Sequence, residues 1–441
     1  MNKVPRVAFH TLGCKVNQQE TDALAAMFCE KGYEIVDFAE KADVYVINTC
    51  TVTHLADRKS RQYIRRCMKT NPSARVVVMG CYAQAEHEEV AQIPGVSLVV
   101  GSSRKNRIVD WLDEENEQTV PAMKVVDINE QRVFEETGAD SVIGRARAYL
   151  KIQEGCEQFC TYCIIPYVRG PVRSRTADNT LREAHKLIES GFKEIILTGI
   201  HVGAYGRDLG HDINLESLLA QLLKITPDVR WRLSSLEPTE VSPEMLELMV
   251  QYPNFCPHLH LPLQSGHNEI LRAMHRPYTI EQYQEVVGLI RNKVPEIAIT
   301  TDIMVGFPGE TNEHFEAYLR FVQAIAFSDL HVFQYSARRG TPAAQFTGQV
   351  RAETKAKRSH VLIEAGRVLS DDYARRFIGR KLEVLVETDL PDGLCEGHSE
   401  NYLTVRFGAE SAKRGEVVPV RVRTVSQGIC YGDDTVKKGG V

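Results

Sequence analysis

Three closely spaced cysteines constrain this chain more than any other feature of its sequence. Cys156, Cys160 and Cys163 follow the pattern C-x3-C-x2-C. A disulfide uses only two thiols, and a four-ligand zinc site usually pairs two C-x2-C hooks, of which no second one follows here. Three thiolates suit a [4Fe-4S] cluster, which normally takes four, so one iron stays open to another ligand. We therefore expect a cluster that acts as a reaction centre, with a zinc site as the alternative.

The composition is that of a globular protein with more than one domain. At 441 residues the chain is too long for one ordinary core, and 43% hydrophobic with 25% charged residues is typical of soluble proteins. The net charge of -5 means that a nucleic-acid partner would need a local basic surface. The sequence shows no long apolar run and no signal-peptide pattern, so no membrane span is expected. Eleven cysteines without a secretion signal favour metal binding in the reducing cytoplasm.

Residues 1–115 alternate short apolar runs with helical patterns. This alternation predicts a doubly wound α/β domain with an open parallel sheet. Its strands are expected at 7–9, 44–47, 76–79 and 98–100, and its helices at about 18–31, 55–70 and 83–93.

A cysteine follows each of the first three expected strands, at Cys14, Cys50 and Cys81. Open α/β sheets bind ligands beyond the carboxyl ends of their strands, so three thiols far apart in sequence can meet in one crevice. We therefore expect them to hold a second cluster, again with an open iron. The alternative is that each is a small buried hydrophobe, as free cysteines often are.

The helix expected over 55–70 is strongly basic, with Asp57 as its only acid. Charge alone leaves a solvated helix face and a phosphate-binding surface as alternatives. The position of the helix directly after Cys50 favours phosphate contact. The candidates for contact with RNA are Arg58, Arg61 and Arg65.

The stretch 116–145 is polar and weakly periodic, which predicts a linker. The next domain is expected over 146–370. Six β/α units in this region are too few for a full eight-fold barrel and predict a partial (β/α)6 barrel, with its chemistry at the carboxyl ends of the strands. The expected strands are 148–153, 194–198, 230–236, 258–263, 298–305 and 329–335.

The cysteine motif, with Tyr162 directly before its third cysteine, resembles the radical S-adenosylmethionine (SAM) enzymes, which commonly use such a partial barrel. The resemblance implies that Cys156, Cys160 and Cys163 are catalytic cluster ligands and that the open iron holds the methionine part of SAM. It also implies that SAM cleavage yields a 5′-deoxyadenosyl radical. Tyr162 would lie near the SAM adenine.

Polar and glycine residues at the strand ends of this domain are candidates for SAM binding. Carboxylate, amide and hydroxyl groups can bind an amino acid and a ribose, and glycine lets a backbone approach a ligand closely. A loop or cap role is the alternative at each position. The candidates are Thr198, Gly199, Glu237, Gln264 and Ser265.

Three arginines, Arg169, Arg173 and Arg175, follow the cysteine loop. We expect them to bind the SAM carboxylate or a substrate phosphate, with structural salt bridges as the alternative. His258 and His260 alternate along an expected strand, and we interpret them as strand residues and not as metal ligands.

Residues 371–441 change to short alternating strands separated by Gly and Asp turns, which predicts a small all-β barrel. Small barrels of this kind often bind nucleic acid on one face, and Arg421 and Arg423 are the candidates for RNA contact. Acids nearly balance the bases here, so a structural appendage is the alternative.

The order of these three regions resembles the radical-SAM methylthiotransferase family, which joins a three-cysteine cluster domain, a partial barrel and a C-terminal TRAM barrel that grips RNA. The residues around Cys14 and Cys50 are similar to the branch that acts on N6-threonylcarbamoyladenosine at tRNA position 37. Sibling branches act on isopentenyladenosine or on a ribosomal-protein aspartate and typically show Gly-Cys-Gln-Met-Asn or Gly-Cys-Pro-Lys-Asn. The matching elements here are Thr11-Leu12-Gly13-Cys14-Lys15-Val16-Asn17, Asn48-Thr49-Cys50-Thr51-Val52-Thr53 and Gly80-Cys81.

The resemblance implies a SAM-dependent transferase with two [4Fe-4S] clusters. The cluster on Cys14, Cys50 and Cys81 would carry the sulfur that one SAM methylates. The radical from a second SAM would remove hydrogen from adenine C2, where the methylthio group couples. The implied partners are tRNA, through its anticodon stem-loop, and an electron donor such as flavodoxin or ferredoxin, and a monomer is expected. A non-catalytic iron-sulfur or zinc protein that binds RNA is the rival from another class.

Overall fold

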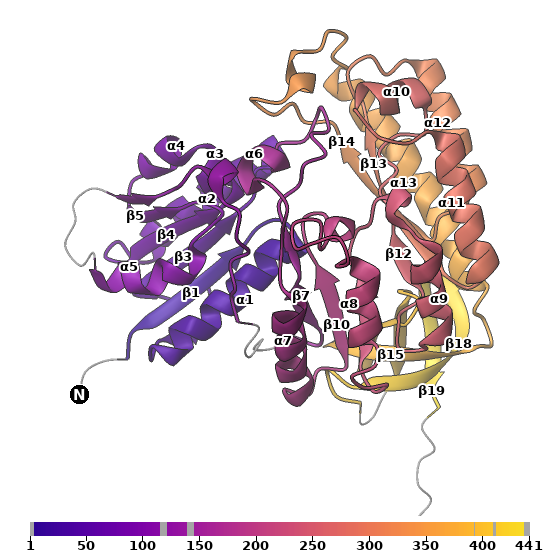
Figure 1. Cartoon of the computed structure of the whole chain (residues 1–441), viewed down its shortest axis with the longest axis horizontal. Coiled ribbons are helices and arrows are strands. Elements are labelled where there is room, and N and C mark those ends of the chain that lie inside the picture. The colour runs from indigo at the N-terminus through magenta and orange to yellow at the C-terminus, as the bar shows by residue number, and fades with distance from the viewer. Residues whose placement is uncertain (1–3, 115–120, 139–144, 392, 409–411, 436–441) are drawn as a thin grey trace, which may run out of the picture.

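The computed structural model describes residues 4–114, 121–138, 145–391, 393–408 and 412–435. Three regions follow one another along the chain: an N-terminal α/β sheet, a central partial barrel and a C-terminal closed β-barrel (Figure 1). This is the fold class that the sequence predicts. Residues 116–120 and 139–144 of the expected linker, and 436–441 at the chain end, lie outside the described residues. None of the described helices combines the length and the apolar character needed to cross a membrane.

The N-terminal sheet has parallel strands in the order β2-β1-β3-β4-β5-β6. Every residue of β3 is buried, as expected for a parallel strand covered on both faces. Helices α1 and α5 pack on one face, and α2, α3 and α4 pack on the other. The strands are β1 (Arg6–Thr11), β2 (Glu34–Val36), β3 (Val44–Thr49), β4 (Arg75–Gly80), β5 (Val96–Val100) and β6 (Ala122–Lys124). The helices are α1 (Lys15–Glu30), α2 (His54–Thr70), α3 (Cys81–Ala85), α4 (His87–Ala91) and α5 (Ile108–Glu114).

Strand β6 lies in the stretch that the sequence pattern assigns to a linker. It pairs in parallel with β5, with Leu98 opposite Ala122 and Val100 opposite Lys124, and so belongs to the N-terminal sheet. Strand β2 is also absent from the sequence prediction. Both strands have three residues, which is too short for a recognisable apolar pattern.

The central region contains two parallel sheets, in the orders β11-β10-β7 and β12-β13-β14. Parallel bridges from Trp231 to Phe255 and from Ser235 to His260 connect them, and one apolar core is shared by both. In the described part of the chain β7 and β14 do not pair, so the barrel is partial, as predicted. The strands are β7 (Ala148–Lys151), β10 (Glu194–Thr198), β11 (Arg230–Leu233), β12 (His258–His260), β13 (Ala298–Val305) and β14 (Asp329–Gln334). The helices are α7 (Ala177–Glu189), α8 (Leu215–Leu222), α9 (Pro243–Gln251), α10 (Asn268–Ala273), α11 (Ile280–Lys293), α12 (Asn312–Ile325) and α13 (Ala352–Arg375).

The long connection from β7 to β10 adds a short antiparallel pair and a short helix. These are β8 (Gln153–Glu154), α6 (Ile165–Arg169) and β9 (Arg173–Ser174). Single turns of 3-10 helix occur at η1 (Lys105–Arg107), η2 (Ile128–Glu130), η3 (Val202–Ala204), η4 (Pro238–Glu240) and η5 (Pro342–Gln345).

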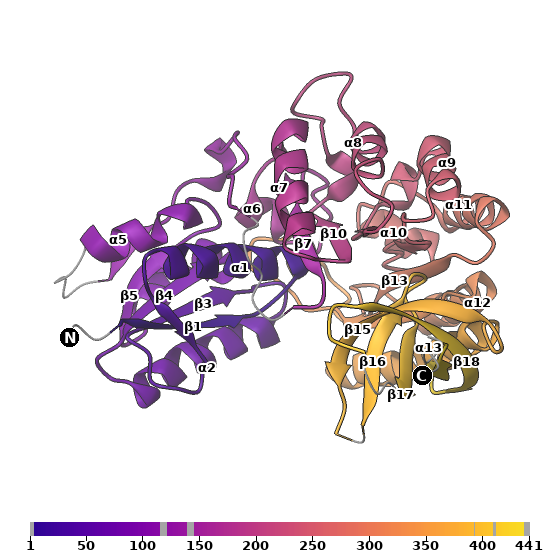
Figure 2. The same ribbon diagram turned by 90° about the horizontal axis from the view of Figure 1, so that it is seen from below.

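The C-terminal strands close into a barrel in the order β15-β16-β17-β19-β18, beside α13 and β13 (Figure 2). Its core includes Ala298 of β13. Arg230 Nη1 donates to the Glu383 carbonyl at 2.7 Å and Arg232 Nη2 donates to the Ser399 carbonyl at 3.1 Å, so arginines of the central sheet also hold the barrel. The strands are β15 (Lys381–Asp389), β16 (Leu394–Ser399), β17 (Thr404–Gly408), β18 (Val417–Ser426) and β19 (Ile429–Asp434).

Candidate functional site

The N-terminal triad consists of Cys14, Cys50 and Cys81, which lie at the carboxyl ends of β1, β3 and β4. Gly13 has a φ of +106°, and a Cβ atom placed there would lie 3.2 Å from the Cys50 Sγ and 3.0 Å from its Cβ. Glycine therefore lets the Cys14 loop approach Cys50 closely. Cys50 and Cys81 are buried, whereas Cys14 is exposed to solvent.

The sulfurs of the N-terminal triad act on one another electrostatically. Burial, with repulsion from Cys81 and Cys14, raises the pKa of Cys50 to about 12. Although Cys14 keeps contact with solvent, the protein atoms packed around its thiol desolvate it and raise its pKa, and the Arg169 guanidinium opposes this change. Three bare thiolates are therefore unfavourable together, and a cation that takes up their charge would relieve the repulsion. Three sulfurs that repel one another in this way fit a metal cluster better than a role in packing.

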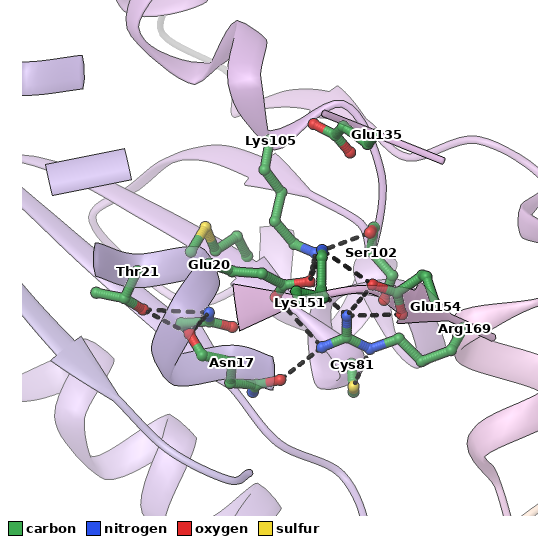
Figure 3. A network of polar contacts seen from close by, with 12 residues as sticks. Asn17, Glu20, Thr21, Cys81, Ser102, Lys105, Glu135, Lys151, Glu154 and Arg169 are labelled. Atoms are coloured by element: carbon green, nitrogen blue, oxygen red, sulfur yellow. Dashed lines mark hydrogen bonds and ion pairs between the residues drawn. The ribbon is translucent and has the colours of Figure 1, made fainter. Parts of the chain in front are cut away.

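A buried arginine donates a hydrogen bond to the N-terminal triad (Figure 3). The Arg169 side chain is 0% exposed, and its Nε donates to the Cys81 Sγ at 3.1 Å. Its Nη1 donates to Glu20 Oε1 at 2.6 Å and to Glu154 Oε1 at 3.1 Å. Because Arg169 ends α6, shortly after Cys163, this one side chain links the central cysteine loop to the N-terminal domain.

Two lysines complete this buried network. Lys105 Nζ lies 2.8 Å from Glu20 Oε1, and Lys151 Nζ lies 3.3 Å from the same oxygen and 3.1 Å from Glu154 Oε2. With the arginine, the directly linked groups are three cations and two carboxylates, which leaves one positive charge beside the Cys81 sulfur. A thiolate that binds iron carries a negative charge and would balance the network, because buried charges are costly unless they are paired.

The central triad, Cys156, Cys160 and Cys163, lies in the loop after β8. Gly155 opens this loop with a φ of +77°, and a Cβ atom there would lie 1.9 Å from the Pro171 carbonyl oxygen, so the position requires glycine. The Cys163 N–H donates to the Cys160 carbonyl at 2.9 Å. Burial raises the pKa of Cys160, and burial with repulsion from the other sulfurs raises the pKa of Cys163. This donor set also fits a metal cluster.

Two side chains that the sequence pattern does not single out contact the central triad. Arg276 Nη1 donates to the Cys160 Sγ at 3.3 Å, and His201 Nδ1 lies 3.8 Å from the Cys156 Sγ. Burial opposes protonation of His201, but hydrogen bonds to Cys156 and Glu240 raise its pKa to about 10. No motif or spacing marks either residue, since only the fold brings them to the cysteine loop.

Comparison with known proteins decides between the alternatives. Residues 6–101 match the uncharacterized protein family UPF0004, and residues 150–322 match the radical SAM superfamily. The chain is 42% identical to the threonylcarbamoyladenosine tRNA methylthiotransferase MtaB of Bacillus subtilis, over 94% of this chain and 93% of that protein. This chain belongs to the radical-SAM methylthiotransferase family. It is also 35% identical to the tRNA-2-methylthio-N(6)-dimethylallyladenosine synthase of Acetivibrio thermocellus, over 94% of this chain and 88% of that protein.

The fold agrees with this family. The radical S-adenosylmethionine methyltransferase TsrM of Kitasatospora setae superposes with a TM-score of 0.57 at 15% identity, over 77% of each chain. As a radical-SAM methylthiotransferase, the chain is a SAM-dependent transferase, and SAM and [4Fe-4S] clusters are the cofactors of its family, as predicted. These findings favour the enzyme over the non-catalytic RNA-binding alternative.

The structure changes the interpretation of Arg169, Arg173 and Arg175, which the sequence pattern assigns to RNA or SAM. All three side chains are buried. Arg173 Nη2 donates to the Arg169 carbonyl at 3.0 Å, and Arg175 Nη2 donates to the Thr137 carbonyl at 2.8 Å. Because their guanidinium groups make contacts inside the protein, they are not available to RNA, and the structural alternative replaces that prediction.

Of the SAM candidates, Glu237 and Gly199 lie close to the central triad. Glu237 forms an ion pair with Arg276, the residue that contacts a cysteine sulfur, and burial raises the pKa of Glu237. A Cβ atom at Gly199 would lie 3.0 Å from the Gln153 carbonyl oxygen, so this loop packs directly on the strand that leads into the cysteines. Thr198 is buried at the end of β10.

The other three SAM candidates lie near the end of β13. Tyr162 packs in an apolar group with Met304, and the Gln264 carbonyl accepts from the Met304 N–H at 2.8 Å. Gln264 has a φ of +63°, which is uncommon for a residue other than glycine. Ser265 is buried, and its Oγ has no hydrogen-bond partner among the described residues. An unpaired buried hydroxyl is a candidate contact for a bound polar ligand.

Proposed function

We propose that this protein adds a methylthio group to C2 of N6-threonylcarbamoyladenosine at position 37 of tRNA. The proposal rests on two cysteine triads, each with a buried arginine on one sulfur, in two domains joined by one buried ion network. The relatives from Bacillus subtilis and Aquifex aeolicus, at 42% and 41% identity, are named for threonylcarbamoyladenosine. Relatives from Acetivibrio thermocellus and Clostridium botulinum, named for dimethylallyladenosine, are 35% and 33% identical, which favours the first substrate.

Each triad is proposed to hold a [4Fe-4S] cluster, and the central triad to place SAM on its open iron. When bound, these groups supply a radical that removes hydrogen from adenine C2 and the sulfur that takes its place. The protein keeps the ligand sulfurs in position, with Arg169 on Cys81 and Arg276 on Cys160. Each arginine also holds a positive charge beside an anionic ligand, which favours the thiolate form.

The residues near the central triad are proposed to bind SAM. Glu237 offers a carboxylate to an ammonium or ribose hydroxyl group, and Ser265 offers an unpaired hydroxyl. Tyr162 offers an aromatic face to the adenine. The proposed set is Tyr162, Thr198, Gly199, Glu237, Gln264 and Ser265.

Exposed arginines in two regions are proposed to contact tRNA. Arg58 and Arg65 lie exposed on α2, and Arg61 is half-buried. Arg421 and Arg423 lie exposed on β18 of the C-terminal barrel. Phosphate contacts of this kind are independent of sequence and weaken with salt, because binding releases counterions.

Replacing Arg58 and Arg65 together by glutamine is expected to weaken binding to tRNA and to unrelated RNA alike. The slope of log K against log salt should fall by about 1.5, the contribution of two phosphate contacts. Fluorescence anisotropy over a salt series measures this slope. The matched control is Arg182→Gln with Arg320→Gln, which removes two exposed charges from α7 and α12. An equal change in both double variants would mean that α2 only adds to the overall charge.

We also propose a cytoplasmic, monomeric protein that takes electrons from a donor such as flavodoxin or ferredoxin. A separate donor is part of the proposal because reductive cleavage of SAM consumes an electron that side chains do not supply.

Product analysis tests the proposed function. The anaerobically reconstituted enzyme, with SAM and dithionite, is given tRNA that carries N6-threonylcarbamoyladenosine or tRNA that carries dimethylallyladenosine. Mass spectrometry of the digested nucleosides is expected to show the methylthio product from the first tRNA. A product from the second tRNA alone would contradict the proposed substrate.

A further inference from the structure

A row of side chains is exposed on the inner face of the partial barrel. Strand β14 lies at the edge of its sheet, and Leu330 and Val332 pack into the core on the side of α13. The alternate residues face the other way: the His331 side chain is 48% exposed and Phe333 is 49% exposed. Parallel strands are usually covered on both faces, so this row borders open space inside the barrel.

Three polar groups of neighbouring strands meet in this row. Asp302 of β13 lies opposite His331 in the sheet register, and the His331 Nδ1 is 3.2 Å from the Asp302 Oδ1. The His260 Nε2 of β12 lies 3.3 Å from the same oxygen. Thr300 Oγ1 lies 2.9 Å from the His260 Nδ1 and orients that ring. The Asp302 side chain remains 30% exposed, so a ligand can reach the carboxylate.

This polar group lies close to the central triad. Two residues farther along the two strands, Met304 pairs with Phe333. Met304 also packs in the apolar group that contains Tyr162. Tyr162 stands directly before the last cysteine of the triad. Two residues along a strand span about 7 Å. A base that stacked on Phe333 would therefore place a substituent at Asp302 and His331.

Lys15 brings a positive charge to this place from the N-terminal domain. Its ammonium group lies within electrostatic range of Asp302 and of Arg147 and Arg232. Both arginines form ion pairs or hydrogen bonds with Glu194. Lys15 itself makes no hydrogen bond or ion pair in the part of the chain that the structure describes. It is half-buried, and it is therefore a cation for which the protein provides no paired anion.

We infer that Lys15, His260, Asp302 and His331 form a subsite for the polar substituent on N6 of the substrate adenosine. This inference rests on the proposed function. A threonylcarbamoyl group carries a carboxylate, a hydroxyl and amide N–H groups. The Lys15 ammonium and the His331 Nε2–H donate to the carboxylate, and the Asp302 carboxylate accepts from a hydroxyl or an N–H. His260, whose two ring nitrogens already face Thr300 and Asp302, holds Asp302 in place. A dimethylallyl group can satisfy none of these groups, so the subsite discriminates against it.

Binding to RNAs that differ only at position 37 tests the subsite. The full-length, anaerobically reconstituted protein is titrated with synthetic anticodon stem-loops that carry N6-threonylcarbamoyladenosine, unmodified adenosine or dimethylallyladenosine. The wild type is expected to prefer the first. In Lys15→Met, which keeps the length of the side chain, and in Asp302→Asn, this preference should fall by about 10-fold to about 100-fold. Lys15→Arg should recover part of the preference. The affinity of all variants for the unmodified stem-loop should stay within about twofold of wild type, because contacts to the RNA backbone supply that affinity.

The controls separate the subsite from its neighbours. Lys41→Met and His211→Ala remove an exposed lysine and an exposed histidine elsewhere and should leave the preference unchanged. Because Lys15 is next to Cys14, the iron content of each variant is measured to show whether the N-terminal triad is intact. If Lys15→Met binds less iron than wild type, the test of the subsite rests on Asp302→Asn alone.

Two results would overturn the inference. One is a wild-type preference that survives in both Lys15→Met and Asp302→Asn. The other concerns a metal ion, because ligand atoms of His260, Asp302 and His331 lie within 4.8 Å of one another and could hold one. Calorimetry would then show stoichiometric binding of Zn²⁺, and Asp302→Asn would abolish this binding without changing the RNA preference. If the wild type itself shows no preference for the threonylcarbamoyl stem-loop, the proposed function fails instead.

Discussion

Replacing Cys14, Cys50 and Cys81 together by alanine is expected to halve the bound iron, from about eight to about four atoms per chain. The methylthio product should disappear, because the proposed sulfur-carrying site is lost. Cleavage of SAM to 5′-deoxyadenosine should continue, because the central triad and the Arg276 contact to Cys160 lie in a separate domain.

Iron and sulfide analysis after anaerobic reconstitution measures the first effect, and chromatography of the nucleosides measures the other two. A matched variant replaces Cys29, Cys67 and Cys256, which lie outside both triads, and should keep about eight irons. About four irons in the wild type and in the Cys14 triple variant alike would mean that the N-terminal triad binds no cluster, and the proposed function would lose its sulfur donor site.

Replacing Arg169 by methionine is expected to destabilise the protein by about 3–5 kcal/mol, the usual cost of removing one partner from a buried ion pair. The change leaves Glu20 and Glu154 with two lysines and removes the donor from the Cys81 Sγ. Thermal or denaturant unfolding measures the loss. Arg169→Lys keeps the charge but not the forked geometry, so its free energy of unfolding should lie between those of wild type and Arg169→Met.

The sulfur contact is tested separately from stability. In a background with Cys156, Cys160 and Cys163 replaced by alanine, the N-terminal cluster should be reduced at a more negative potential in Arg169→Met than with Arg169 present. Loss of a positive donor beside a ligand sulfur disfavours the extra electron. A redox titration followed by electron paramagnetic resonance gives the potential. The exposed Arg182→Met is the control for both measurements and should change stability by no more than about 0.5 kcal/mol. An unchanged potential in Arg169→Met would mean that Arg169 holds the domains together without acting on the cluster.

Local sequence patterns predict the scaffold of this protein well. The apolar runs at β1, β3, β4 and β5, and the cysteine that follows each of the first three, are enough to predict the N-terminal triad. These signals are local, because burial on both faces of a parallel strand requires a continuous apolar run. Strand β6 escapes prediction because Ala122, Met123 and Lys124 form too short and too mixed a run.

The sequence by itself therefore determined the family, the three regions and both cysteine triads, because strand length, turn residues and cysteine spacing are properties of neighbouring residues. Only the tertiary structure decided what the arginines do. Arg169 donates hydrogen bonds to Glu20 and Cys81 of the N-terminal region. Arg276 donates to the Cys160 sulfur, which is far from it in the sequence. Whether a guanidinium binds RNA or a buried carboxylate depends on burial and on distance through space, and neither can be read from the order of residues along the chain.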